Sequence, residues 1–347
     1  MIYIEDDALV INFPDLHPNA GVRIDLQRTL RLPDDGKDHP LPPGLGSFPL
    51  RHIADYDLVE NNDLKSRGGV IMPMFQADAL WLNFDPITDD YDSIEYPLAI
   101  KIGTGKLCAV SGNEWSSKLR KKPQNYIVVP EQPWLDGYNV SDGTVRQFVA
   151  APLGDGVTAE EQIRGSSDIG GIQIQVFPMK RSYYDELNSF ELAPAMSMDY
   201  CMAPSIDSPE FMGLAAGGKM EQEISKDPHK MAAWDKDVSE RCFITIANAR
   251  QWMAMTGEEP PLSPINADEY TRAGLPWFSY YNDDTKAIEG AKVLGGLKSF
   301  QKAYADQGED KWLKEIPKML ASQTYRIHYD CFRALVKLRQ TDNNSQK

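Results

Sequence analysis

The sequence predicts an α+β fold, in which a β-rich first half is followed by loops and helices. Val22–Gln27 and Gly171–Phe177 alternate apolar and polar residues, which is the period of a half-buried strand. The turn residues Gly103–Lys106 and Ser141–Gly143 each separate two apolar runs, as in a β-hairpin. Helix signals gather late in the chain. We therefore expect a β-rich body over 1–180 and a loop-rich connector with helices over 181–347, either separate or packed on the first part as a single domain.

The remaining elements of the first half follow from local patterns. Pro33–Pro49 is rich in proline, which lacks an N–H and fixes φ, so it is predicted to be a loop packed on the body. Thr158 with Glu161 forms a capping-box pattern, which predicts a short helix. Apolar runs predict strands at Ala8–Phe13, Gly69–Met74, Ala79–Phe84, Leu98–Ile102, Leu107–Val110, Tyr126–Val129, Tyr138–Val140 and Thr144–Ala150.

The second half changes character. Residues 181–235 hold several prolines and glycines and are predicted to be mostly loops. Cys242–Ile246 is a predicted strand that could return to the first sheet, and Ala247–Thr256 is a helix ended by Gly257. Further helices are predicted from Asn266, over Lys286–Ala305, and over Ser322–Gln340, where an apolar stripe accompanies many basic residues.

Composition limits the class of protein. The chain has 347 residues, of which 42% are hydrophobic and 25% charged, as in ordinary folded proteins. Its formal net charge of -15 repels phosphate backbones and anionic membranes, so we expect neither nucleic acid nor membrane as a partner. The acidic N-terminus does not resemble a secretory signal. The four cysteines are widely spaced, at Cys108, Cys201, Cys242 and Cys331, which favours free thiols in a reducing cytoplasm.

One stretch has the spacing of a phosphate-binding loop. Gly213, Gly218 and Lys219 fit G-x-x-x-x-G-K, but Met220 stands where such a loop needs Ser or Thr to hold Mg²⁺. The preceding residues also make a poor strand. We therefore predict a glycine-rich turn at the junction of the two halves, and keep phosphate binding at these three residues as a weak alternative.

Two clusters hold possible metal ligands or acid–base groups. Asp34, Asp35, Asp38 and His39 lie close in sequence but lack the spacing of a calcium loop, so we predict no metal site and no cofactor. His52 stands three residues before Asp55, so the two share a face if the segment is helical. His52 and His229 are the two histidines with the best claim to a catalytic role.

Two proline-bracketed segments combine aromatic and acidic residues. PEQPWLDGY carries the acids Glu131 and Asp136 with Trp134 and Tyr138, and GLPWFSYYNDD carries Trp277 and Tyr281. Such loops on a rigid sheet suit a sugar, a peptide or another polar ligand. The alternative is that both tryptophans anchor their loops in the core. Burial of both would remove the basis for ligand contact through them.

The function that we predict from these features is binding, to a protein partner or a small polar ligand, through the loops around Trp134 and Trp277. The alternative is a hydrolase whose acids come from Glu131, Asp136 or the Asp34/Asp35 pair, with His52 as a further candidate. A second alternative is nucleotide or phosphate binding at Gly213–Lys219. A hydrolase requires these groups to converge in one pocket, whereas a binding protein requires exposed aromatic surface.

Overall fold

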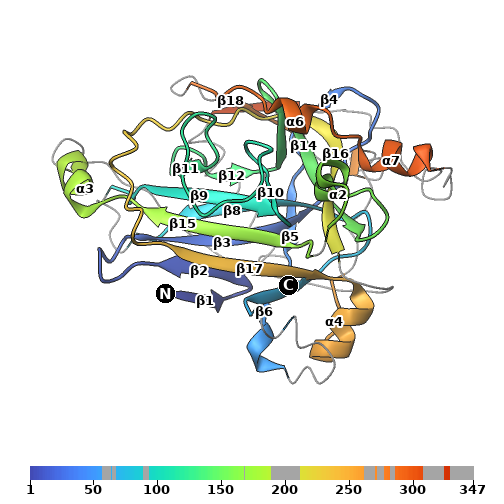
Figure 1. Cartoon of the computed structure of the whole chain (residues 1–347), viewed down its shortest axis with the longest axis horizontal. Helices are drawn as coiled ribbons and strands as arrows, with labels where there is room; N and C mark the ends of the chain where they lie inside the picture. The colour runs from blue at the N-terminus through green and yellow to red at the C-terminus, as the bar shows by residue number, and fades with distance from the viewer. Residues whose placement is uncertain are drawn as a thin grey trace.

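A computed structural model of the chain describes residues 1–328 except 57–63, 65–67, 89–93, 168, 189–211, 262–269, 272–276, 282–285 and 308–323 (Figure 1). One 17-stranded sheet that is largely antiparallel dominates the described chain, and the described helices are short and lie mostly late in the sequence. The fold is therefore α+β with a β-rich first half, as the sequence predicts.

The strands of the large sheet carry the following bounds: β1 Ile2–Glu5, β2 Ala8–Asn12, β3 Gly21–Thr29, β4 Asp38–His39, β5 Gly44–Ser47, β6 Arg51–His52, β7 Val70–Pro73, β8 Ala79–Pro86, β9 Leu98–Thr104, β10 Leu107–Cys108, β11 Ile127–Val129, β12 Trp134–Leu135, β13 Gly137–Ser141, β14 Thr144–Pro152, β15 Ile172–Pro178, β16 Met212–Glu221 and β17 Glu240–Ala247. A separate parallel pair consists of β18, Trp277–Tyr281, and β19, Thr324–His328.

Two runs of neighbouring strands supply one core. The first run is β1–β2–β3–β8, which continues through β14 to β16. The second run is β11–β9–β15–β17, which continues in parallel to β7. Ile24 and Leu82 from the first run and Ile102, Ile174 and Ile244 from the second belong to the same hydrophobic cluster. Burial of the apolar face of both runs is what stabilises this arrangement.

The opposite face of the second run carries a row of polar residues. Gln175 of β15 is in register with Lys101 of β9 on one side and with Arg241 of β17 on the other. Successive side chains of a strand point to opposite faces, so these three residues form a row on the side away from Ile102 and Ile174. This row positions the candidate site.

The described helices follow local sequence signals. They are η1 Ile53–Asp55, α2 Ala159–Arg164, α3 Arg181–Asn188, α4 Ala249–Thr256, α6 Lys292–Gly295 and α7 Phe300–Asp306. The predicted capping box of α2 is present, with Thr158 and Glu161 bonded reciprocally. Helix α4 begins after the N-cap Asn248 and ends at Gly257 in the left-handed conformation, so both of its ends are confirmed within two residues of the prediction.

Six predictions of secondary structure were wrong in whole or in part. Trp134–Leu135 and Trp277–Tyr281, which were expected to lie in loops, are strands β12 and β18. The Gly213–Lys219 stretch lies within β16 instead of in a turn. The proline-rich segment contains the short strands β4 and β5. Lys286–Ala305 forms two short helices, and Thr324–His328 is strand β19 where a helix was expected. In β19 the sequence Tyr-Arg-Ile-His also alternates, and pairing with β18 prevails over helical propensity.

The helix predicted from Asn266 begins outside the described residues. Cys201, Cys331 and the part of Ser322–Gln340 other than β19 also lie outside them. None of the described helices is long and apolar enough to span a membrane. The strand predicted at Cys242–Ile246 is confirmed as β17, and it pairs with β15 of the first half.

Candidate functional site

The PEQPWLDGY segment turns its aromatic residues inward. Trp134 is 1% exposed and Tyr138 is fully buried. Trp134 Nε1 donates to Asp136 Oδ2 at 2.6 Å, and Tyr138 Oη is bonded to Thr104 Oγ1 at 2.9 Å. Burial raises the pKa of Asp136 to about 7, although the hydrogen bond from Trp134 acts in the opposite direction. These residues anchor the segment and present no surface to a ligand, so the expected contact through them finds no support.

The GLPWFSYYNDD segment also turns its tryptophan inward, in the part that the structure describes. Trp277 is fully buried, packs at 5.4 Å against Tyr270 and donates to Thr271 Oγ1 at 3.2 Å. Tyr281 ends β18, and its side chain lies outside the described part of the chain. With both tryptophans in the interior, a binding function needs a different surface.

The glycine-rich stretch serves close packing. In β16, a Cβ on Gly217 would lie 2.6 Å from Val149 Cγ2, and one on Gly218 would lie 2.5 Å from the carbonyl oxygen of Pro33. Glycine is thus required there by the approach of neighbouring backbone and side chains. Lys219 is in register with Arg146 of β14 and Asp38 of β4. A phosphate loop needs N–H groups that point freely at an anion from a strand–helix turn, and a ten-residue strand gives no such turn.

The structure brings Glu131 and His229 together. His229 Nε2 lies 3.5 Å from Glu131 Oε1, and the two side chains are 16% and 23% exposed. Within the described residues, neither His229 Nε2 nor Glu131 Oε2 has a hydrogen-bond partner. A carboxylate beside an imidazole is the arrangement that orients a general base. The acid predicted from sequence therefore meets His229 and not His52.

Asp227 supports this pair from beneath. Its Oδ2 accepts hydrogen bonds from Tyr126 Oη at 2.5 Å and Trp234 Nε1 at 3.1 Å, and lies 3.4 Å from Lys121 Nζ. Its Oδ1 accepts the backbone N–H of His229 at 2.7 Å. Burial, together with the bond to Asp227, raises the pKa of Tyr126 well above its ordinary value. Asp227 is thus a fixed, fully bonded group that sets the position of His229.

The Asp34/Asp35 pair has other neighbours. Asp34 accepts a hydrogen bond from Ser299 Oγ and lies 3.5 Å from an Arg146 nitrogen, while burial raises its pKa. Asp35 Oδ1 lies 2.9 Å from His39 Nε2. Burial opposes ionisation of Asp35, but hydrogen bonds from Lys37 and His39 lower its pKa. Among the described residues, no group of three or more His, Cys, Asp or Glu side chains could hold a metal ion.

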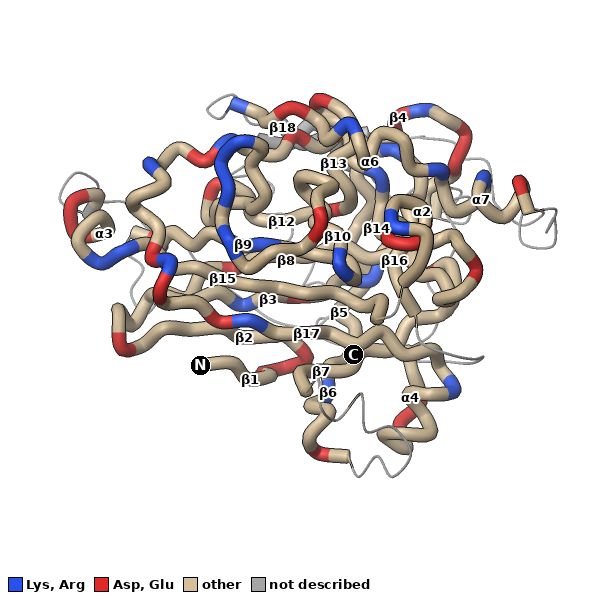
Figure 2. The backbone as a smooth tube through the Cα atoms, in the orientation of Figure 1, with Lys and Arg blue, Asp and Glu red and all other residues tan. Residues whose placement is uncertain are grey.

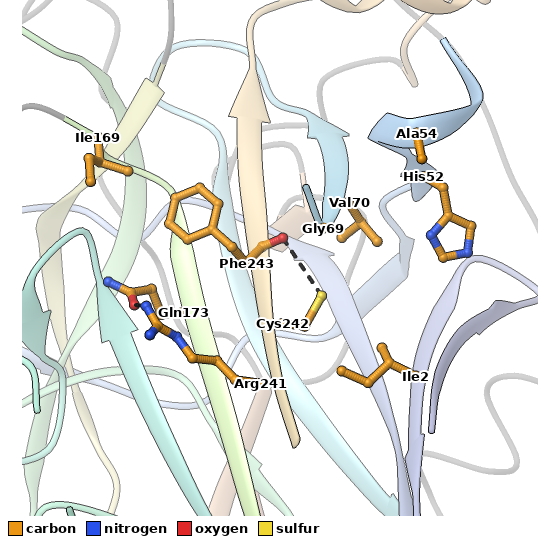
Figure 3. A pocket seen from close by; sticks show the side chains of 10 residues that line it. All are labelled: Ile2, His52, Ala54, Gly69, Val70, Ile169, Gln173, Arg241, Cys242 and Phe243. Carbon is orange, nitrogen blue, oxygen red and sulfur yellow. Dashed lines mark hydrogen bonds between the residues drawn. The ribbon is translucent and has the colours of Figure 1, made fainter. Parts of the chain in front are cut away.

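A cavity of about 590 Å³ opens at the edge of β17 (Figure 3). Its lining residues come from β1, β6, β7, β15, β17 and the adjoining loops: Ile2, His52, Ala54, Gly69, Val70, Ile169, Gln173, Arg241, Cys242 and Phe243. The volume is within the range of small-molecule sites, and apolar walls with a few polar groups are typical of them. His52 ends β6, and its imidazole forms no hydrogen bond in the described part, including none with Asp55. Burial raises the pKa of the Cys242 thiol to about 12, which leaves it unreactive at neutral pH.

The guanidinium of Arg241 is held in place without a carboxylate. It donates to Gln173 Oε1, and Gln173 in turn donates through Nε2 to the carbonyl of Gly105. One face of Arg241 lies over the ring of Trp115, at 5.7 Å from the centroid. Within the described residues, no acidic side chain pairs with this exposed arginine. Figure 3 shows Arg241 and Gln173 side by side, on the opposite side of the cavity from His52.

Lys101 adds a second cation beside the same indole. Its Nζ lies 5.2 Å from the Trp115 ring centroid and donates to the carbonyl of Lys118 at 2.8 Å. Burial lowers the pKa of Lys101 to about 8. Trp115 lies over Gly103, where a Cβ would come within 2.4 Å of its ring, and both cations lie near the same ring. Of these two cations, Arg241 is exposed and Lys101 is buried.

Sequence reasoning did not find Arg241, Gln173, Trp115 or Lys101. The signal was present in part, because Lys101 interrupts an otherwise apolar strand, Leu98–Ile102. Their association depends on the register of β9, β15 and β17, which one-dimensional patterns do not give.

Comparisons of the chain with protein families, curated proteins and solved structures found no match.

Proposed function

We propose that this protein binds a small anionic ligand with an apolar body in the cavity at the edge of β17. A carboxylate on such a ligand would meet the Arg241 guanidinium, which presents donors in a planar fork that suits two acceptor oxygens. Val70, Ile169 and Phe243 would cover the apolar body. The observation that carries the proposal is the orientation of Arg241 by Gln173 and Trp115 in the absence of an acidic partner among the described residues. We further propose, as the sequence predicts, that the protein is cytoplasmic.

The test is a thermal-shift and calorimetric titration with hexanoate and phenylacetate, with hexanol and benzyl alcohol as uncharged matches. We expect both carboxylates to raise Tm and both alcohols to have little effect. A ligand present at about 100 times its Kd adds roughly 2.7 kcal/mol to the free energy of unfolding. Arg241→Gln should weaken binding by at least about tenfold, since a charge-assisted bidentate contact is lost. Arg250→Gln, at an exposed arginine of α4, is the matched control. Equal responses of the two variants would contradict the proposal.

A second candidate function is hydrolysis, which the 3.5 Å approach of His229 to Glu131 favours. In this proposal Glu131 orients the imidazole, and His229 takes a proton from an attacking water. The test is a panel of p-nitrophenyl esters with the wild type, His229→Gln and Glu131→Gln. Turnover that falls by about two orders of magnitude in His229→Gln would support this role. Turnover that is the same in all three proteins would exclude it.

A further inference from the structure

A tight turn beside β9 projects four cations. Lys118, Arg120 and Lys122 are exposed, and Lys121 is half-buried. Figure 2 shows this segment as an extended blue stretch near β9. In the part of the chain that the structure describes, the side chains of the three exposed cations form no hydrogen bond and no ion pair. The turn thus concentrates unpaired positive charge on a protein whose net charge is -15.

A second basic loop lies against this turn. Lys226 and Lys230 are exposed and equally unpaired among the described residues. The loops are joined by Lys121, whose Nζ donates to the carbonyl of His229 and lies 3.4 Å from Asp227 Oδ2. Asp227 is buried and pairs with Lys121, so its charge is offset by that lysine and not by the exposed cations. We call the exposed side chains of these two loops the basic surface: Lys118, Arg120, Lys122, Lys226 and Lys230.

The basic surface is held on a braced backbone. Asn125 accepts the N–H of Arg120 at 2.8 Å and donates to the carbonyl of Lys118 at 3.0 Å. Gln124 donates to the carbonyl of Ser225 at 3.0 Å and accepts the N–H of Asp227 at 3.0 Å. A turn fixed in this way loses little backbone entropy when it binds, which is the advantage of a preorganised recognition surface.

The chemistry of the surface selects among anionic partners. Cations spread over two solvent-facing loops fit an extended anion better than a small ligand, which requires an enclosing cavity. A nucleic acid duplex carries one charge per roughly 1.7 Å over its whole length, so it would also meet the acidic remainder of this protein. A short acidic peptide segment can place its charges on the basic surface alone. Complementary charge of this kind determines specificity and the rate of association.

We infer that the basic surface is an interaction site for a protein partner that presents a short run of Asp and Glu residues. The site is independent of the cavity at β17 and of any ligand there. It also differs from the aromatic loops through which the sequence suggests that partners bind.

The probe is a fluorescently labelled octaglutamate peptide, with octaglutamine as the uncharged match, measured by anisotropy at low and at physiological ionic strength. We expect wild-type protein to bind octaglutamate, with affinity that falls as salt rises, and to ignore octaglutamine. Arg120→Glu/Lys122→Glu should weaken binding by about tenfold or more, because two attractions become repulsions. Arg250→Glu/Lys292→Glu is the control, since it reverses one arginine and one lysine that are also exposed but lie on α4 and α6.

Three results would overturn the inference. These are no binding of octaglutamate by the wild type, equal loss of binding in the two double variants, and tighter binding of a short DNA duplex than of the peptide. The last result would assign the surface to nucleic acid instead. An unchanged response of Arg120→Glu/Lys122→Glu to hexanoate would show that the variant is folded and that the cavity is intact. Failure of the peptide assay therefore does not affect the ligand proposed for the cavity.

Discussion

Two segments of this protein that lie close in sequence differ in which side chains they bury and which they expose. PEQPWLDGY, which has the residues of a binding loop, places Trp134, Asp136 and Tyr138 in the core. The turn Lys118–Lys122, which resembles no motif, leaves three cations exposed and unpaired within the described chain. The comparison shows that aromatic residues in a proline-bracketed segment can anchor that segment in the core. The exposed charges of the turn, unpaired among the described residues, are the basis of the proposed interaction site.

The largest expected effect concerns the anchoring role of Trp134. Trp134→Ala should lower the free energy of unfolding by about 3–5 kcal/mol, because it leaves a cavity in the core. Trp134→Phe should cost less, since most of the volume is kept. Urea denaturation followed by far-UV circular dichroism measures both. If Trp134→Ala were as stable as the wild type, the anchoring role of this loop would be refuted.

A smaller effect concerns the buried carboxyl of Asp136. The pKa of Asp136 in the folded state, about 7, exceeds its value in the unfolded state. At a pH between these two values, the folded state therefore binds more protons than the unfolded state. Stability contributed by this group is therefore greatest at low pH and falls as pH rises towards 7, by about 2 kcal/mol between pH 5 and 7. The remainder is lost as pH rises through 7, and above about pH 8 the contribution is constant.

Asp136→Asn removes this titration and should flatten the dependence of the free energy of unfolding on pH over the same interval. Denaturation at several pH values compares the two slopes, so that any constant change in stability caused by the substitution cancels. Parallel curves for wild type and variant would show that Asp136 is ionised throughout.

The smallest effect is expected at the exposed turn. Arg120→Glu/Lys122→Glu should change the free energy of unfolding by less than about 0.5 kcal/mol, since these side chains make no contact that the fold needs. Thermal and urea denaturation at physiological salt check this. A loss as large as that of Trp134→Ala would mean that the turn has a structural role, and the contrast between the two loops would disappear.

Much of the β-sheet is predictable because its strands alternate apolar and polar residues or are continuously apolar, as in Val22–Gln27 and Gly171–Phe177. The caps of α2 and α4 are predictable because a few local residues determine them. Strand β16 is not predictable in this way, because its Gly and Ala residues have weak β-propensity. Its glycines are required by close contacts with Val149 and Pro33, which cannot be read from the sequence.

The candidate sites are less predictable than the fold. Glu131 and His229 were each identified as candidates, but their approach depends on how two loops pack. The contact between Arg241 and Trp115 is equally hard to predict, because it depends on the register of β17 and on the position of the loop that carries Trp115. The burial of Trp134 and Trp277 could have gone either way from sequence, because an aromatic ring beside prolines suits a ligand and a core equally well.

The side-chain amides that brace the basic surface have a consequence for local opening of the chain. The N–H groups of Arg120 and Asp227 are both bonded to side chains, Asn125 and Gln124, that are adjacent in sequence. The N–H of Ser225 is bonded to Gln132, which belongs to the PEQPWLDGY segment. Exposure of any one of these amides to solvent disturbs loops far apart in the chain, so the three should exchange their hydrogens as one cooperative unit. An exposed turn would then be as slow to open as the core segment to which it is tied.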